Sequence, residues 1–490
     1  MRVEAVGFSP EGAVCRLLAV LPGGAPAGTA PAASSAGEPG PELASSARTV
    51  GPEHALAPGA PADEAIAPAR RLVVPGLLPG EIATVELGRE PAAARVRLLE
   101  RPHPDRVPPS CPRFRDPAPC PLLVLPPAAQ ARVKVAMLED ALREAGLPDA
   151  SGELLPLLSG PPFGYRAKAV FAVAPGREGP RLGYYAPGTQ QLRPGTNCPL
   201  HLPAIAHLAA TVEQVLRRVR LPAWQAGQDH GLRFVTVRAA RQGGAWVLLT
   251  GGPATRPGLL HEAATRLLAQ TGGELRTVWW SPQGQSVNEV VGEAPVCLAG
   301  RAGLWEQAGQ IAVPLTPGAF HQASPVAGDL LIAEVRQAAA ASGATHALDL
   351  FCGVGAYALD LAATGLTVTG VERDAAGIAA ARRAAKSARL SLELVEADAT
   401  AYLAAAEATP GRGELVVLNP PRRGAAPELL ARLAARRPRR IVYVSCHPTT
   451  LARDLARLAS HGYALLQVRP VDLLPQTAQV EAVAVCVPRD

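Results

Sequence analysis

Short apolar runs alternate with amphipathic stretches over the last third of the chain, from about residue 325 onward. The runs predict buried strands, and the stretches, whose apolar residues recur at helical spacing, predict helices. This alternation is typical of a mostly parallel, doubly wound α/β sheet, which binds ligands at the carboxyl ends of its strands. The predicted strands cover 347–350, 367–372, 391–395, 414–418 and 440–444, and the predicted helices cover 326–342, 375–388 and 427–436.

The first 100 residues show a different pattern, in which apolar and polar residues alternate. Two short strands are expected around a turn at 9–12, and further strands at 71–76, 81–87 and 95–99. Several short strands close together predict a small β-barrel. Residues 22–69 are mostly Gly, Ala, Pro and Ser. We expect a disordered insertion there, because so few large apolar side chains cannot offset the entropy of ordering.

Residues 101–310 carry both kinds of pattern and predict an α+β central region. Three domains are therefore expected: a barrel at 1–100 interrupted at 22–69, a central domain at 101–310, and a Rossmann-like α/β domain at 311–490. The central strands are expected at 166–174, 233–239, 245–250 and 275–280, and helices at 128–145 and 203–219.

The composition limits which partners and compartments the chain favours. Lys and Arg together number 48, of which Lys134, Lys168 and Lys386 are the lysines, leaving 48 − 3 = 45 Arg. A GC-rich coding sequence supplies Arg, Ala, Gly and Pro, so the net charge of +6 permits nucleic-acid binding without establishing it. Eight cysteines are too sparse for a disulfide scaffold, and no apolar run is long enough for a membrane span. We expect a cytoplasmic monomer.

A glycine-rich turn follows the first predicted strand of the α/β region. It reads D-L-F-C-G-V-G at 349–355 and opens a helix, so the backbone can approach a ligand closely. Glu372 ends the next strand, where a carboxylate binds ribose hydroxyls, and Asp398 follows the third strand, where an adenine amine could donate to it. The spacing favours S-adenosylmethionine (SAM) over a dinucleotide; the alternative is a glycine turn in another α/β fold.

Candidate reactive groups follow later strands of the same sheet. Asn419 precedes two prolines that stiffen a loop, and Cys446 comes directly after the predicted strand 440–444. Glu481 precedes the final strand. A cysteine and a carboxylate beside a SAM site form a nucleophile and a base. The alternative for Cys446 is the usual one for a free cysteine, which is burial as an apolar side chain.

These motifs together resemble the RNA uracil-5-methyltransferase family. The segment F-H-Q at 320–322 resembles the family's F-x-Q, the block Y-V-S-C-H-P-T-T-L-A-R-D-L at 443–455 resembles its nucleophile signature, and Q-V-E at 479–481 resembles its general base. The segment L-L-P-G-E at 77–81 resembles a TRAM domain, a small RNA-binding barrel. The resemblance implies a Rossmann-like methyltransferase domain and methylation of a uridine at C5 through a covalent bond between Cys446 and C6, with Glu481 as the base. The expected cofactor contacts are Gln322, Phe351, Gly353, Gly355, Ala356, Glu372, Asp398 and Asn419.

The chain departs from the family pattern at three places. Asn419 stands where the family commonly has Asp, and His447 where its signature usually has Asn, so His447 receives no role. Many relatives bind a 4Fe-4S cluster through C-x5-C-x2-C and a distant fourth cysteine. Here Leu123 takes the third position, which leaves Cys111, Cys120 and Cys198 as candidate ligands for a doubtful cluster.

The RNA target and the reaction class each keep an alternative. Ribosomal RNA, as 23S rRNA, is favoured over tRNA because tRNA members of the family usually lack the TRAM barrel. An amino-group methyltransferase is the second enzyme reading, since N-P-P at 419–421 is similar to the loop of those enzymes. A third reading is a non-catalytic RNA-binding protein. Arg422 and Arg423 adjoin Asn419, and we expect them to contact RNA phosphates.

Overall fold

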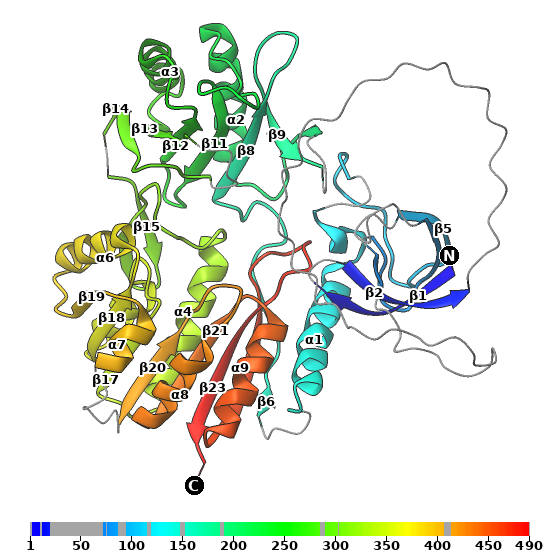
Figure 1. Cartoon of the computed structure of the whole chain (residues 1–490), viewed down its shortest axis with the longest axis vertical. Helices are drawn as coiled ribbons and strands as arrows, with labels where there is room; N and C mark the ends of the chain where they lie inside the picture. Colours follow the sequence, from blue (N-terminus) through cyan, green and yellow to red (C-terminus); the bar gives the residue numbers. More distant parts are fainter. Residues whose placement is uncertain are drawn as a thin grey trace, which may run out of the picture.

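The computed structural model arranges the chain around three β-sheets and a two-stranded ribbon, as far as its described residues go. Figure 1 shows the C-terminal sheet below, the central sheet above and the N-terminal sheet beside them. The predicted insertion at 22–69 lies outside the described residues. The structure describes residues 2–9, 12–19, 72–74, 76–86, 95–114, 119–147, 152–186, 191–284, 290–301, 303–405 and 413–489.

The C-terminal sheet has the doubly wound α/β topology that the sequence predicts, with the strand order β19-β18-β17-β20-β21-β23-β22. The first five strands are parallel, and β23 then runs antiparallel between β21 and β22. Buried apolar strands are expected in a sheet covered on both faces, and the side chains of 415–418 are fully buried. The strands are β17 (His346–Leu350), β18 (Thr367–Glu372), β19 (Glu393–Glu396), β20 (Glu414–Leu418), β21 (Arg440–Ser445), β22 (Tyr463–Asp472) and β23 (Glu481–Pro488).

Helices cover both faces of this sheet and bury its two apolar cores. Helices α4 (Pro325–Ala340) and α5 (Ala356–Ala363) pack on one face. The other face is covered by α7 (Ala399–Ala405), α8 (Pro427–Arg436) and α9 (Pro448–Ser460). Helix α6 (Ala375–Ala388) packs beside α5 and the ribbon of β15 (Trp305–Ala308) and β16 (Ile311–Pro314). The helix expected at 427–436 is found with those bounds, whereas 326–342 is shifted to 325–340.

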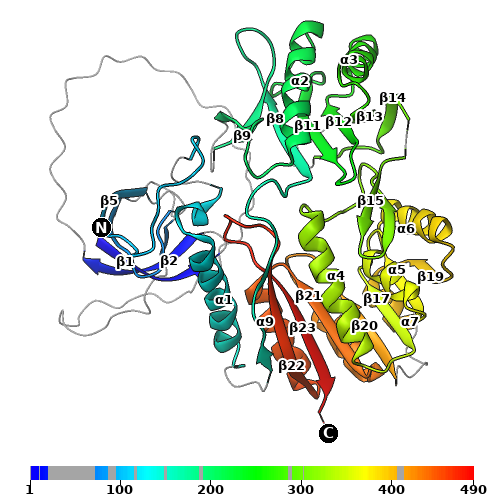
Figure 2. The ribbon, with the colours of Figure 1, turned by 180° about the vertical axis from the view of Figure 1, so that it is seen from behind.

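A segment that precedes the central sheet in sequence joins the C-terminal sheet in space. Helix α1 (Pro127–Glu144) lies against α9, and the short strands β6 (Glu153–Leu154) and β7 (Leu158–Ser159) pair with β22. The other side of α1 packs on Leu78 and Leu122, near the N-terminal sheet. Figure 2 shows α1 between the two sheets, so one helix ties the N-terminal sheet to the C-terminal sheet.

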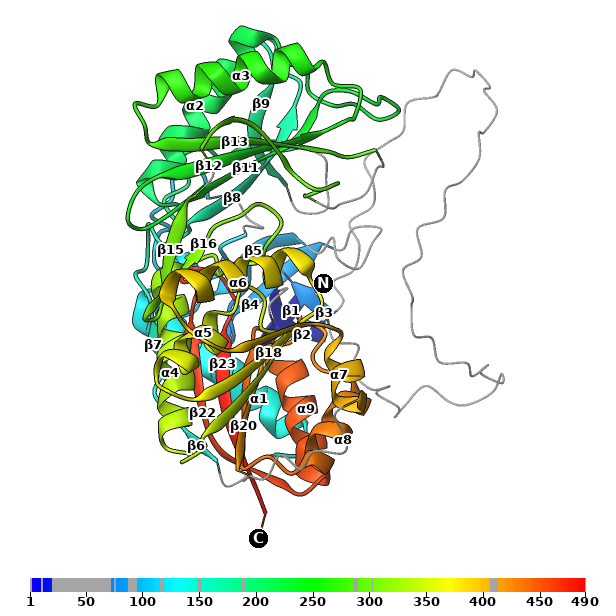
Figure 3. The same ribbon diagram turned by 90° about the vertical axis from the view of Figure 1, so that its left-hand side faces the viewer.

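The central sheet has the order β10-β9-β8-β11-β12-β13-β14, with α2 (Pro203–Val219) and α3 (Pro257–Gln270) packed on one face. Figure 3 shows both helices on the side away from the C-terminal sheet, which leaves the second face of the central sheet turned toward that sheet. The strands are β8 (Lys168–Ala174), β9 (Arg181–Tyr185), β10 (Leu192–Pro194), β11 (Leu232–Ala239), β12 (Ala245–Gly251), β13 (Leu275–Pro282) and β14 (Val296–Gly300).

The N-terminal sheet has the order β3-β2-β1-β4-β5 and is antiparallel throughout. Its strands are β1 (Arg2–Ser9), β2 (Gly12–Ala19), β3 (Leu72–Val74), β4 (Ile82–Glu86) and β5 (Arg95–Arg101). The number and order of short strands suit the expected barrel, whose assignment as a TRAM domain stays a prediction. Among the helices that the structure describes, none combines the length and the apolar character needed to cross a membrane.

Candidate active site

The glycine-rich turn between β17 and α5 is built from backbone conformations that open it to a ligand. Phe351, Gly353 and Gly355 all have positive φ angles of 65°, 55° and 81°. A side chain at Gly353 would meet nothing within 4 Å, whereas one at Gly355 would lie 3.1 Å from Ala381 and Leu359. Gly355 therefore allows close packing at the start of α5, and Gly353 leaves space for a bound molecule.

Two carboxylates support this turn from behind. Glu372 accepts a hydrogen bond from the Gly353 amide at 3.1 Å, and Asp349 accepts one from the Ala358 amide at 3.0 Å. Burial raises the pKa of Asp349 to about 8; the Ala358 amide lowers this pKa and Glu372 raises it. The second carboxylate oxygen of Asp349 is buried without a hydrogen-bond partner. Asp349 is thus a structural group: its carboxylate holds the first turn of α5, and the hydrogen bond from Ala358 favours its ionised form.

A pocket lies in front of the turn, at the carboxyl ends of β17 and β20. Five of the residues expected to contact the cofactor line it, whereas Gly355, Glu372 and Asp398 do not. Asp398 instead accepts hydrogen bonds from Thr400 and Ala401 at the start of α7. The pocket's position at the strand ends and the open space at Gly353 fit a nucleoside cofactor such as SAM. The five lining residues are Gln322, Phe351, Gly353, Ala356 and Asn419.

The antiparallel pairing of β21 with β23 brings the candidate nucleophile and base together. Ser445 pairs with Ala482, so Cys446 and Glu481 extend from neighbouring strand ends. Burial raises the pKa of the Cys446 thiol; Glu481 raises it further, and Arg422 lowers it. Burial also raises the pKa of Glu481 to about 7, and Arg422 opposes that shift. The thiol, the carboxyl group and the guanidinium group therefore act on one another as a single electrostatic cluster.

Helix α9 holds the loop that carries Asn419 and the two arginines. Asp454 is fully buried and accepts hydrogen bonds from the Tyr443 hydroxyl at 2.7 Å and the Ala425 amide at 2.8 Å. Arg453 donates to Asp454 at 2.9 Å and to the carbonyl of Arg423 at 2.8 Å. Because α9 begins at Pro448, two residues after Cys446, these contacts fix the loop relative to the thiol.

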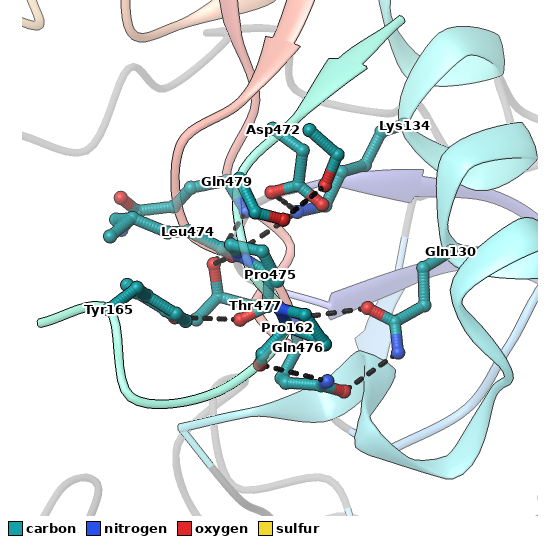
Figure 4. Close-up of polar contacts among 12 residues, drawn as sticks. Gln130, Lys134, Pro162, Tyr165, Asp472, Leu474, Pro475, Gln476, Thr477 and Gln479 are labelled. Atoms are coloured by element: carbon teal, nitrogen blue, oxygen red, sulfur yellow. Dashed lines mark hydrogen bonds and ion pairs between the residues drawn. The ribbon is translucent and has the colours of Figure 1, made fainter. Parts of the chain in front are cut away.

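The loop between β22 and β23, which leads into Glu481, is held by α1 and by the central region. Lys134 is fully buried and lies 2.5 Å from a carboxylate oxygen of Asp472. Gln130 donates to the side chain of Gln476 at 2.7 Å, and the Tyr165 hydroxyl donates to the carbonyl of Pro475 at 2.7 Å. Figure 4 shows these contacts converging on the loop from separate parts of the chain. They determine where β23, and with it Glu481, begins.

The three cysteines expected as cluster ligands do not form a metal site. Burial raises the pKa of the Cys120 thiol to about 12; Cys198 and Cys111 raise it further, and Arg166 lowers it. Leu123 is buried. Over the described part of the chain, no group of three or more His, Cys, Asp or Glu side chains is placed to hold a metal ion. The residues present therefore do not fit a 4Fe-4S cluster, which needs four thiolates.

The arginines near the catalytic edge differ in what they contact. Arg432 pairs with Glu428, and Arg436 with Glu414 at 2.7 Å, so these two stabilise the scaffold. Arg422 and Arg423 are exposed, and the structure pairs neither guanidinium group with a carboxylate of the described residues. Their backbone carbonyls, by contrast, accept hydrogen bonds from Thr450 and Arg453 on α9.

Sequence reasoning did not identify the residues that hold the reactive groups in place. Lys134 and Asp472 belong to no motif, and they lie 338 residues apart in sequence. Asp454 lies inside the block at 443–455, but no pattern there shows that it holds the amide of Ala425. One signal was available for Lys134: it is one of three lysines among 48 basic residues, in a predicted amphipathic helix. In a chain whose basic residues are nearly all Arg, a lysine in a predicted helix is a candidate for a specific contact.

Comparison with known proteins identifies relatives over most of the chain. A family model for a methyltransferase domain matches residues 347–416. An RNA methyltransferase of Geobacter sulfurreducens is 32% identical over 77% of both chains. The 23S rRNA (uracil(1939)-C(5))-methyltransferase of Alkalilimnicola ehrlichii is 30% identical over 85% of this chain and 91% of its own.

A solved structure shares the fold. The tRNA (uracil-54, C5)-methyltransferase of Pyrococcus abyssi, determined with S-adenosyl-L-homocysteine, superimposes with a TM-score of 0.66. The match covers 85% of this chain and 94% of the archaeal chain at 23% identity. The likeness therefore supports the arrangement of the sheets.

Replacing Lys134 by Met should strongly destabilise the protein, because Asp472 is left buried without its partner. The expected loss is about 3 kcal/mol in the free energy of unfolding, measured by urea denaturation. Lys386→Met, at an exposed site on α6, should change this free energy by less than about 0.5 kcal/mol. Equal stability of the two variants would show that the Lys134–Asp472 pair does not hold the loop.

Proposed function

Because this chain belongs to the family of SAM-dependent RNA uracil-5-methyltransferases, we propose that it methylates C5 of a uridine in 23S rRNA through a covalent bond between Cys446 and C6 of the base. The observation that supports this most is the adjacency of Cys446 and Glu481 at the strand ends of the sheet that also carries the cofactor pocket. A thiol and a carboxyl group beside a methyl donor are the groups that this reaction needs.

The cofactor would lie in the pocket in front of the glycine turn. Gln322, Phe351 and Asn419 line that pocket from three separate segments, and Gly353 leaves the turn open toward it. When bound, SAM supplies a methyl group on a positively charged sulfur. The uncharged Asn419 side chain can accept a hydrogen bond there through its oxygen without adding charge.

The chain's own residues activate the base and then restore it. C5 of uracil is a weak nucleophile, so the Cys446 thiolate first adds to C6 and moves the electron pair of the double bond toward C5 and O4. C5 then takes the methyl group. Glu481 removes the remaining proton from C5, the double bond re-forms, and the bond between sulfur and C6 breaks to release the thiolate. The net products are the methylated base, the demethylated cofactor and one proton.

Both reacting side chains work in their deprotonated forms. The raised pKa of Cys446 means that the free protein holds mostly the thiol, and Glu481 with a pKa of about 7 is close to half ionised at neutral pH. Arg422 lowers both pKa values and therefore favours the active forms. We assign Arg422 an electrostatic role as well as contact with RNA.

Ribosomal RNA is favoured as the target for two reasons. The five-stranded N-terminal sheet suits an additional RNA-binding module, and the Alkalilimnicola relative is named for 23S rRNA. A tRNA substrate is the alternative, since the Pyrococcus protein is named for tRNA. Amino-group methylation fits less well: exposed Arg422 stands where an aromatic side chain would stack on the target base, and Cys446 would have no task. The target uridine must leave its stack to reach Cys446.

Cys446→Ala should abolish methyl transfer while leaving SAM affinity within about two-fold, because the sulfur contacts the base and not the cofactor. Activity is measured with tritiated SAM and a 23S rRNA transcript, and affinity by calorimetry. Cys486→Ala, a buried cysteine within the same sheet, serves as the control and should remain active. Substantial turnover by Cys446→Ala would exclude the covalent route.

Glu481→Gln should stop the reaction after methylation, because the C5 proton then has no acceptor and the sulfur cannot leave. The RNA should remain attached to Cys446 as a slowly migrating band on a denaturing gel. The double variant Cys446→Ala/Glu481→Gln should give no such band. If Glu481→Gln alone also gives none, another group removes the proton.

The rate should rise with pH through about 7, as Glu481 loses its proton and more Cys446 becomes thiolate. Arg422→Gln removes the cation that lowers both pKa values, so its profile of kcat against pH should move to higher pH. Arg218→Gln, at an exposed site on α2, removes the same charge and should keep the original profile. An unshifted profile for Arg422→Gln would mean that the guanidinium group does not act on the pair.

Arg423→Ala should weaken RNA binding and reduce the slope of log affinity against log salt by about one phosphate's worth. SAM affinity should be unchanged, because the Arg423 side chain does not line the cofactor pocket. The measurement is fluorescence anisotropy with a labelled 23S rRNA fragment between low and moderate salt. An unchanged salt slope would make Arg423 a scaffold residue.

A further inference from the structure

A second set of polar side chains gathers on the central sheet, on the face turned toward the C-terminal sheet. Lys168 on β8 is directly paired with Arg238 on β11, and Thr236 lies two residues before Arg238 on the same face. The segment after β16 covers these residues, and the Trp246 indole donates to the carbonyl of Leu315 at 3.0 Å to hold it there. Together they enclose a cavity also lined by Thr316 and His321.

The polar groups around this cavity lack partners to an unusual degree. The Nε of Arg238, the hydroxyls of Thr236 and Thr316, and Nε2 of His321 are buried and make no hydrogen bond with any residue that the structure describes. Arg238 is only 2% exposed, and its guanidinium group donates a hydrogen bond to the carbonyl of Gln322 at 3.0 Å. Such groups are normally satisfied, since a buried polar atom without a partner costs about 1–3 kcal/mol.

The cavity is also positively charged with no carboxylate in contact. Within the described chain, neither Lys168 nor Arg238 forms an ion pair, and the nearest acid acting on Arg238 is Glu306. Burial lowers the pKa of Lys168, and Arg238 lowers it further. Burial likewise lowers the pKa of His321 to about 3, with Arg238 and Lys168 adding to the effect, so His321 is neutral. Burial and the mutual repulsion of the positively charged groups account for these directions, and only Glu306 opposes them, at Arg238.

A buried guanidinium group paired across strands with a half-buried lysine, where neither forms an ion pair in the described part of the chain, is the arrangement expected of a site that binds an anion. The cavity volume is about 10 Å³, which accommodates about one oxygen atom or water molecule. An anion would therefore insert a single oxygen between Lys168, Arg238 and the two hydroxyls. The rest of the molecule would lie outside this cavity.

We propose that this cavity, formed by Lys168, Thr236, Arg238, Thr316 and His321, binds a phosphate oxygen of the RNA backbone. The proposal rests on the proposed function for the nature of the polymer, and it deepens that function by assigning a phosphate contact to the central sheet. The site lies next to the cofactor pocket, because Arg238 and His321 line both. A phosphate held there belongs to a nucleotide close to the target uridine.

The cofactor's carboxylate is the other oxyanion within reach, and the position of Lys168 and of the two hydroxyls argues against it. Lys168, Thr236 and Thr316 line the cavity but not the cofactor pocket. Two of them sit on strands of the central sheet, away from the glycine turn. Phosphate is also the anion that an RNA chain presents repeatedly along its backbone.

The test compares Lys168→Gln and Arg238→Gln with Lys386→Gln, which removes the same charge at an exposed site on α6. All are made in the full-length chain, and circular dichroism establishes folding. Binding of a 23S rRNA transcript is measured against salt, and binding of S-adenosyl-L-homocysteine by calorimetry. Because Arg238 is buried, its variant can fail to fold, and Lys168→Gln then decides the outcome alone.

We expect Lys168→Gln to weaken RNA binding roughly ten-fold and to lower the salt slope by about 0.7, one single-strand phosphate contact, with cofactor binding unchanged. Weaker cofactor binding with an unchanged RNA salt slope would overturn the proposal in favour of the cofactor carboxylate. Unchanged affinity for both would overturn it entirely. Methylation is not measured in this test. If the transcript binds but is never methylated, the proposed function is wrong, while the proposed phosphate site is still supported by the binding data.

Discussion

The antiparallel insertion of β23 between β21 and β22 is the constraint on which the candidate active site depends. Cys446 and Glu481 lie 481 − 446 = 35 residues apart, and only this pairing brings them to neighbouring strand ends. A parallel strand in the same place would carry its first residue to the opposite edge of the sheet. The reversal of direction thus places Glu481 beside Cys446 on the edge where parallel α/β sheets bind their ligands.

Buried polar contacts then fix the loops at that edge. Asp454 joins the Asn419 loop to the helix that follows Cys446, and the Lys134–Asp472 pair joins α1 to the loop before Glu481. Burial lowers the pKa of Lys134 and raises that of Asp472, and the contact between the two opposes both shifts. Such groups tolerate little displacement, since each loses its partner when the other moves.

The C-terminal and central sheets carry complementary electrostatic properties. On the C-terminal sheet, Cys446 and Glu481 have raised pKa values and are partly protonated without substrate. On the central sheet, Lys168 and Arg238 line one cavity, and neither forms an ion pair in the described part of the chain. An RNA strand between the two sheets would supply a base to one side and a phosphate to the other. The binding of substrate would therefore stabilise both sides at once.

The sequence alone determined the α/β class and singled out Cys446 and Glu481 as candidate reactive groups, because each follows from local patterns. The strand and helix periods of 367–372, 375–388 and 427–436 fix their bounds without tertiary information. The tertiary structure decided what those patterns cannot encode. It placed α1, β6 and β7 on the C-terminal sheet, turned Glu372 and Asp398 to local backbone amides, and gathered Lys168, Arg238 and His321 around one cavity. These outcomes depend on which distant surfaces pack together, and contacts between distant segments leave no period in the chain.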